Sequence, residues 1–230
     1  MAKVKVFLSP STQEKNPYAG GGNEEQYMRL VCDSAAPYLR SAGVTVKIGG
    51  TESASKSAAD SNAWGATLHV AVHSNAFDGK ADGTITFFYP TSADGKKLAQ
   101  AVQNRIAPFS PGSDYAIQGR SNLVELSATK AIAILTELAF HDNPIEAAHI
   151  RENHAEYGRL LALGILDYLG IKSKDAPSPT PTPTPTPVPA PAPSAGTGKV
   201  KVGSAGLRVR AGAGTGYRQI GSLFNGAKVE

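Results

Sequence analysis

Hydrophobic and polar residues alternate along the first 170 positions with two different periods. Short apolar runs rich in β-branched residues are typical of strands, and apolar residues spaced three and four apart are typical of helices. By this criterion strands are expected at 4–8, 44–48, 68–73, 83–89 and 131–136. Helices are expected at 24–43, with a kink at Pro37, and at 53–64, 95–108, 144–151 and 155–169. Strands and helices therefore follow one another along most of the chain.

This order predicts an α/β fold with a mixed, mostly parallel sheet and helices on both faces. In such sheets binding and catalytic sites gather at the carboxyl ends of the strands. The first expected strand is followed by a polar loop, 9–23, that contains three consecutive glycines. A loop of this length inside a compact domain is usually functional.

Proline divides the chain. Nine of the 16 prolines occupy every second position from Pro177 to Pro193, a density that neither helices nor sheets accept, because proline has no N–H to donate. We therefore expect a first domain over 1–173, an extended Pro/Thr-rich linker over 174–198, and a short β-rich segment over 199–230. Short strands with glycine turns in this last segment predict the start of a small β-barrel.

Composition narrows the class of partner. The net charge of +4 suits an anionic polymer, but the sequence has no long Lys/Arg run, so nucleic acid is not expected as a partner. No apolar run reaches the ~20 residues that cross a bilayer, and Cys32 has no cysteine with which to form a disulfide. The first eight residues alternate like a strand and lack the apolar core of a secretion signal, so we expect synthesis in the cytoplasm without an export signal.

Three polar residues lie where an α/β sheet would bring them together. His73 ends an expected strand, Glu137 ends another, and Glu24 begins the first helix after the long loop. Imidazole and carboxylate are common zinc ligands, and a free carboxylate can act as a base toward water. Glu24 has an alternative role, because a first-turn glutamate stabilises the helix dipole. A carboxylate after an apolar strand, such as Glu137, needs a partner when it is buried.

Two further histidines need separate interpretation. His69 and His73 are four residues apart, which on a strand separates them by about 13 Å, too far to share one metal. His69 is therefore expected to be structural or to support the site from behind. His141 follows Glu137 by four residues. It could lie at the rim of the site, but we expect it on a surface loop.

Several stretches, in order, resemble the N-acetylmuramoyl-L-alanine amidase type-3 family over about 170 residues. They are Val6-Phe7-Leu8-Ser9-Pro10, the helix headed by Glu24, Ala71-Val72-His73-Ser74-Asn75-Ala76, Thr86-Phe87-Phe88-Tyr89, Leu135-Thr136-Glu137-Leu138-Ala139-Phe140 and Asp142-Asn143-Pro144. The resemblance implies a Zn²⁺ cofactor held by Glu24 and His73, with Glu137 as the catalytic base. It also implies peptidoglycan as the substrate, cleaved between N-acetylmuramic acid and L-alanine.

One ligand of that family does not carry over. The family has Gly-His-Gly after its first strand, whereas this chain has Ser11-Thr12-Gln13 and no histidine in the loop. Three outcomes stay open: Gln13 or a nearby loop group replaces the histidine, the zinc is held loosely, or the metal site is lost. An amide oxygen is a neutral and weaker zinc ligand than imidazole.

The last segment resembles the beginning of a bacterial SH3-type wall-binding domain, through 206–212 and 215–221. A non-specific basic tail is the alternative. Together these features predict a zinc-dependent amidase that acts at the bacterial cell wall after release, as a phage endolysin or a mother-cell autolysin. No membrane or protein partner is expected. The competing hypotheses are an inactive, amidase-like wall-binding protein and a zinc peptidase of the stem peptide.

Overall fold

The computed structural model describes residues 3–50 and 52–172 in full. It also describes the backbone of four short strands beyond them. The main unit contains six strands and five helices in its described part. The strands are β1 (Lys5–Pro10), β2 (Thr45–Ile48), β3 (Leu68–Asn75), β4 (Thr84–Phe88), β5 (Asp114–Gly119) and β6 (Ile132–Phe140). The helices are α1 (Glu24–Ser41), α2 (Ala54–Trp64), α3 (Ala93–Ile106), α4 (Val124–Ser127) and α5 (Pro144–Leu169).

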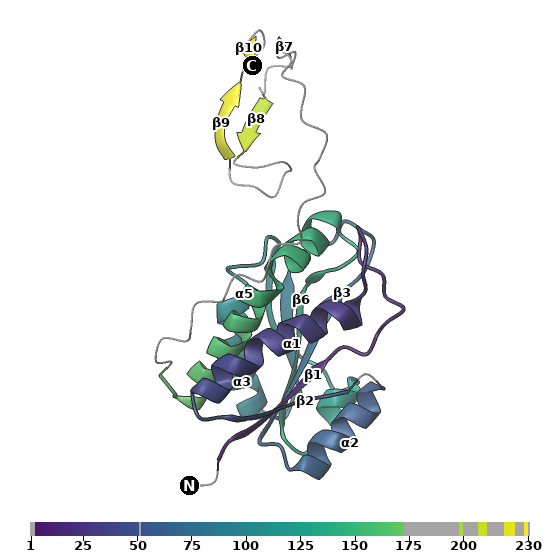
Figure 1. Ribbon diagram of the computed structural model, residues 1–230, viewed down its shortest axis with the longest axis vertical. Helices are drawn as coiled ribbons and strands as arrows, with labels where there is room; N and C mark the ends of the chain where they lie inside the picture. The colour runs from purple at the N-terminus through teal and green to yellow at the C-terminus, as the bar shows by residue number, and fades with distance from the viewer. Residues whose placement is uncertain are drawn as a thin grey trace. The chain divides into compact units, whose positions relative to one another are not determined.

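The six strands form one mixed sheet in the order β2-β1-β3-β6-β4-β5. Strands β2, β1, β3 and β6 run parallel to one another, while β4 runs antiparallel to β6 and parallel to β5. The predicted mixed, mostly parallel sheet is therefore confirmed. Its parallel strands bring the carboxyl ends of β1 and β3 to one edge, where the loop after β1 and the start of α1 also lie (Figure 1).

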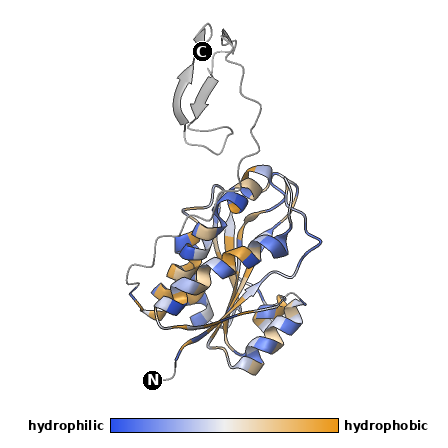
Figure 2. Ribbon diagram, viewed as in Figure 1, coloured by the Kyte–Doolittle hydropathy of each residue, from blue (hydrophilic) through white to orange (hydrophobic). Residues whose placement is uncertain are grey.

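Side chains that alternate along the central strands build two separate apolar layers, one on each face. The larger layer contains Val70, Val72 and Ile134 and packs against α1, α3 and α5. The smaller layer contains Ala71 and Leu135 and packs against Leu126 of α4, and α4 in turn contacts α2. The helices that cover the sheet carry both apolar and polar residues (Figure 2). Helices on both faces, as predicted, follow from this two-sided burial.

Local sequence explains where the helices begin and how closely they pack. The side chains of Asn23, Ser53 and Ser92 each accept a hydrogen bond from the backbone of the first turn, which is the standard N-terminal cap. In α5, Gly158 lies directly against α1: an added Cβ would stand 2.6 Å from the Val31 carbonyl oxygen. A residue with any side chain would therefore push α1 and α5 apart.

Several predicted boundaries differ from the structure. The predicted helices 144–151 and 155–169 form one helix, α5, that is kinked at Asn153 (φ −125°, ψ 20°). Strand β6 continues to Phe140, so Glu137 lies inside the strand and does not end it. Strand β3 likewise extends two residues beyond His73. Neither β5 nor α4 was predicted. Within the described ranges, no helix is long and apolar enough to span a membrane.

The C-terminal segment forms a separate unit, divided from the first between Pro179 and Thr180. Its described strands are β7 (Gly198–Lys199), β8 (Leu207–Arg210), β9 (Gln219–Leu223) and β10 (Lys228–Val229). β8 pairs with β9 and β7 with β10, both antiparallel. The sequence indicates short strands in this segment at 200–202, 206–210 and 216–221; the second and third overlap β8 and β9, and the first lies outside the described residues. The predicted linker, 174–198, lies outside the described residues except for its last position, and the SH3-type assignment stays a prediction.

Candidate active site

His73 and Glu137 face the same side of the sheet because they are register partners on neighbouring strands. His73 lies in β3 directly opposite Glu137 in β6, and residues in register point to the same face of a sheet. This is the face covered by α2 and α4. The sheet therefore holds an imidazole beside a carboxylate, as the sequence predicted.

Glu24 reaches His73 from the first turn of α1. Its Oε1 lies 2.9 Å from His73 Nδ1 and accepts a hydrogen bond from the Ser74 backbone N–H at 3.3 Å. Its Oε2 accepts a hydrogen bond from the Asn16 side-chain amide at 2.8 Å. The residue is 1% exposed. Glu24 is thus both a first-turn glutamate of α1 and a partner of His73, so its two predicted roles do not exclude each other.

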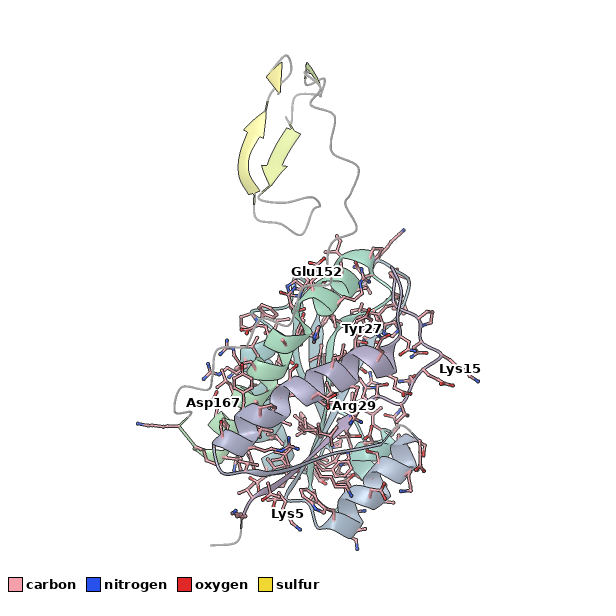
Figure 3. The ribbon with its side chains drawn as sticks, in the orientation of Figure 1. Lys5, Lys15, Tyr27, Arg29, Glu152 and Asp167 are labelled. Atoms are coloured by element: carbon pink, nitrogen blue, oxygen red, sulfur yellow. The ribbon has the colours of Figure 1, made fainter. Side chains whose placement is uncertain are left out.

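Gln13 lies at the edge of this cluster. Its side-chain Nε2 is 3.5 Å from His73 Nδ1, and its Oε1 accepts a hydrogen bond from Asn16 at 2.8 Å. The loop that carries Gln13 runs along the outside of the unit, where Figure 3 shows the side chain of Lys15 pointing away from the protein. The structure therefore brings Gln13, Glu24 and His73 together, with Asn16 as a link between the first two.

The pKa values of His73 and Glu24 depend on burial and on contacts with neighbouring side chains, which act in opposite directions. Burial alone lowers the pKa of His73, but hydrogen bonds to Glu125 and Glu24, together with the charge of Glu137, outweigh burial and raise that pKa to about 10. Burial raises the pKa of Glu24, and the contacts with His73 and Asn16 more than reverse the effect, so its pKa is lowered overall. His73 is thus cationic and Glu24 anionic at neutral pH in the metal-free protein.

Glu137 differs from the other carboxylates. Its Oε2 is buried and has no hydrogen-bond partner among the described residues. Burial raises its pKa to about 7, with the negative Glu24 adding to the rise and the positive His73 opposing it. A carboxylate whose pKa lies near 7 can both accept and return a proton at neutral pH.

Glu125, which the sequence analysis missed, is the other main member of the cluster. It is 3% exposed and comes from the short helix α4. Its carboxylate lies 3.1 Å from His69 Nε2 and 3.4 Å from His73 Nε2, and it accepts a hydrogen bond from the Ser9 hydroxyl. Burial raises the pKa of Glu125, but the hydrogen bonds from His69 and His73 outweigh burial and lower it to about 2. The sequence signal that could have identified Glu125 is a charged residue within the otherwise apolar stretch Leu123-Val124-Glu125-Leu126.

The other two histidines are both buried. His69 is stacked on Phe7 at 5.4 Å between ring centroids and contacts Glu125, so its predicted supporting role is consistent with its position. The expectation that His141 lies on a surface loop is wrong: it is 3% exposed. Its Nδ1 lies 3.1 Å from the Ser74 hydroxyl, and the Tyr18 ring stacks on it at 5.2 Å. The loop before α1 covers His141, which a local pattern does not reveal.

The cluster fits a zinc ion in the chemistry of its donors, although the described residues include no group of three or more His, Cys, Asp or Glu side chains arranged around one metal position. Glu24 and His73 point a carboxylate oxygen and a ring nitrogen at each other. Two atoms bound to one tetrahedral zinc lie roughly 3.3 Å apart, given bond lengths of ~2.0–2.1 Å, and the observed separation is 2.9 Å. Small side-chain movements would therefore admit the ion. Gln13 turns its Nε2 toward His73 and its Oε1 toward Asn16, so its side chain would have to rotate to offer the oxygen as a ligand.

Comparison with known proteins identifies the family of the chain. The family model described as N-acetylmuramoyl-L-alanine amidase matches residues 6–167. An uncharacterized cell wall amidase of Bacillus anthracis is 32% identical over an alignment of 114 residues, and the match covers 44% of this chain and 21% of that protein. The match thus spans about a fifth of the length of this relative.

Two solved structures have the same fold. Cwp6 from Clostridium difficile matches with a TM-score of 0.66 and 23% identity, over 73% of this chain and 30% of its own. The N-acetylmuramoyl-L-alanine amidase AmiC2 of Nostoc punctiforme matches with a TM-score of 0.66 and 21% identity, over 74% of this chain and 98% of its own. The match of the family model over residues 6–167 shows that the chain belongs to the N-acetylmuramoyl-L-alanine amidase family, as the resemblance predicted.

Proposed function

We propose that the chain hydrolyses the amide bond between N-acetylmuramic acid and L-alanine in bacterial peptidoglycan. Membership of the amidase family supports this substrate. Within the site, the observation that carries the proposal is Glu137, which lies opposite His73 in the sheet. Its buried Oε2 has no hydrogen-bond partner in the described part of the chain, and its pKa is raised to about 7. Such a group is suited to general acid–base chemistry.

The proposed reaction needs one proton to move twice. Glu137 takes a proton from the attacking water as the water oxygen bonds to the carbonyl carbon of the lactyl group. The bond from that carbon to the nitrogen of L-alanine then breaks, and Glu137 returns the proton to the departing nitrogen. The products are a free carboxylate on muramic acid and a peptide with a free amine on L-alanine.

A zinc ion is the proposed cofactor, because the family is generally zinc-dependent. Glu24 and His73 would hold it, with the Gln13 side chain as the third protein ligand in place of the missing histidine. A zinc at this position supplies a Lewis acid for the carbonyl and lowers the pKa of bound water. His73 must release its Nδ1 proton before Nδ1 can act as a ligand, so metal affinity falls toward acidic pH.

The second candidate is a wall-binding protein without catalysis, and the absence of the loop histidine favours it. The two are separated by the turbidity of purified cell walls, measured with added zinc and with chelator. If the chain is an enzyme, the zinc-loaded wild type should clear the wall suspension and the Glu137→Gln variant should not. Glu152→Gln, which changes an exposed residue, is the matched control and should clear the walls normally. Binding to walls without clearing, in the zinc-loaded wild type, would instead establish the second candidate.

We also propose that the protein acts at the cell wall as an endolysin or autolysin, with residues 199–230 as part of a wall-binding module. The amidase family supports the place of action, and the antiparallel pairing of β8 with β9 is compatible with a small β-barrel. Co-sedimentation of the full chain and of residues 1–173 with purified walls tests the second point. If both sediment equally, residues 199–230 do not contribute to wall binding.

A further inference from the structure

We propose that Glu125 is a positioning residue that fixes the His73 ring so that Nδ1, and not Nε2, faces Glu24 and the proposed metal. This inference rests on the proposed function, because it concerns how the same site is prepared for zinc. It assigns a role to a buried carboxylate that is neither a proposed zinc ligand nor the proposed base.

Glu125 is anchored independently of His73. Helix α4 is held to α2 by the Asn62 side chain, which donates to the Ala128 carbonyl at 2.9 Å and accepts from the Lys130 N–H at 2.7 Å. Leu126, the next residue along the helix, is buried in the smaller apolar layer. The position of the carboxylate is therefore set by the packing of α4 on the sheet and does not depend on the site that it contacts.

Every partner of the Glu125 carboxylate can donate a hydrogen bond. The Ser9 hydroxyl and His69 Nε2 both contact Oε1, while His73 Nε2 lies 3.4 Å from Oε2. In the part of the chain that the structure describes, no Lys or Arg forms an ion pair with this carboxylate. Because an ionised carboxylate only accepts hydrogen bonds, Glu125 requires an N–H on each of the two rings that face it.

This requirement determines which hydrogen His73 would give up to bind zinc. In the metal-free protein both ring nitrogens face a carboxylate and both carry a hydrogen, Nδ1 toward Glu24 Oε1 at 2.9 Å and Nε2 toward Glu125 Oε2 at 3.4 Å. With Glu24 as a ligand of the proposed zinc, Glu125 would still require the hydrogen on Nε2, which leaves the Nδ1 lone pair for the metal. The opposite tautomer would place the Nε2 lone pair against the charge of Glu125 and a hydrogen where a metal would bind. A carboxylate behind a ligating histidine is a general way to orient the ring and raise its basicity. His69, whose buried Nδ1 has no partner among the described residues, is held in the same tautomer.

The test is the zinc affinity of the full chain, measured by competition with a chelator dye for the wild type and three variants. Glu125→Gln keeps the shape of the side chain but offers an N–H₂ group to the ring, and so favours the wrong tautomer. We expect its zinc affinity to fall about 10–100-fold. Ser57→Ala is the matched control, because Ser57 contacts Ser9 in the same buried network without contacting His73, and its affinity should stay within about twofold. Glu24→Gln marks the effect of losing a ligand.

A second measurement needs no variant that could fail to fold. The ¹⁵N spectrum of histidine in the zinc-loaded wild type should show His73 protonated at Nε2 and unprotonated at Nδ1. Zinc bound through Nε2, or a Glu125→Gln variant that folds and binds zinc as tightly as the wild type, would overturn the inference while leaving the proposed amidase activity intact. A wild type that takes up no zinc would overturn the inference together with the proposed cofactor, and wall clearing without zinc would then show whether the proposed reaction survives.

Discussion

The raised pKa of Glu137 predicts that replacing this residue stabilises the metal-free protein at alkaline pH. Burial raises its pKa from the ordinary value of 4.5 to about 7, and each pH unit of difference is worth roughly 1.4 kcal/mol. A pKa that is higher in the folded state favours folding below pH 4.5, and this contribution is lost as the pH rises through 7. The ionised Glu137 therefore costs at most about 3.5 kcal/mol of unfolding free energy by pH 8.5.

Urea unfolding of the wild type and Glu137→Gln, both in chelator, measures this cost. Between pH 5 and pH 8.5 the difference in unfolding free energy should shift by about 2–3 kcal/mol in favour of the variant. Glu152→Gln makes the same chemical change on the exposed surface of α5, and its difference should stay flat. A Glu137→Gln difference that is equally flat from pH 5 to 8.5 would refute the assignment of a protonatable, desolvated carboxylate to this position.

Three other changes test separate parts of the structure. Glu24→Gln removes a hydrogen bond that raises the pKa of His73, so an NMR titration of metal-free protein should show the His73 pKa lowered; an unchanged value would contradict the contact. Gly158→Ala should reduce the unfolding free energy by about 1–3 kcal/mol, because the added Cβ would meet the α1 backbone, whereas Gly50→Ala, with open space around it, should be nearly neutral. Dialysis against chelator should abolish wall clearing and added zinc should restore it; full activity of metal-free protein would exclude the proposed cofactor.

Most of the fold could be predicted from the sequence because its central elements are strongly patterned. The apolar runs of β1, β3 and β6 are buried on both sides of the sheet, so their composition alone marks them as strands. Strand β5 escaped prediction because it is a polar edge strand whose residues are largely exposed. Helix α4 has four residues, too few for a period of 3.6 to appear. Asn153 interrupts α5 without ending it, which periodicity cannot distinguish from two helices.

The site was predictable only where its residues stand at the ends of patterned elements. Glu24 begins a helix and His73 lies near the end of a strand, so their positions followed from the sheet. Glu125 did not follow, because its contact with His73 joins residues 52 positions apart through an unpatterned segment. The burial of His141 likewise depends on how the loop after β1 folds back over β3, which is a tertiary arrangement.

The central claim is that this chain cuts the bond between N-acetylmuramic acid and L-alanine with Glu137 as the base. Mass spectrometry of purified peptidoglycan after digestion tests it most directly. The account predicts stem peptides with a free L-alanine amine and glycan strands without peptide, produced by the zinc-loaded wild type and not by Glu137→Gln. Products that keep L-alanine on muramic acid, or an undiminished yield from Glu137→Gln, would contradict it.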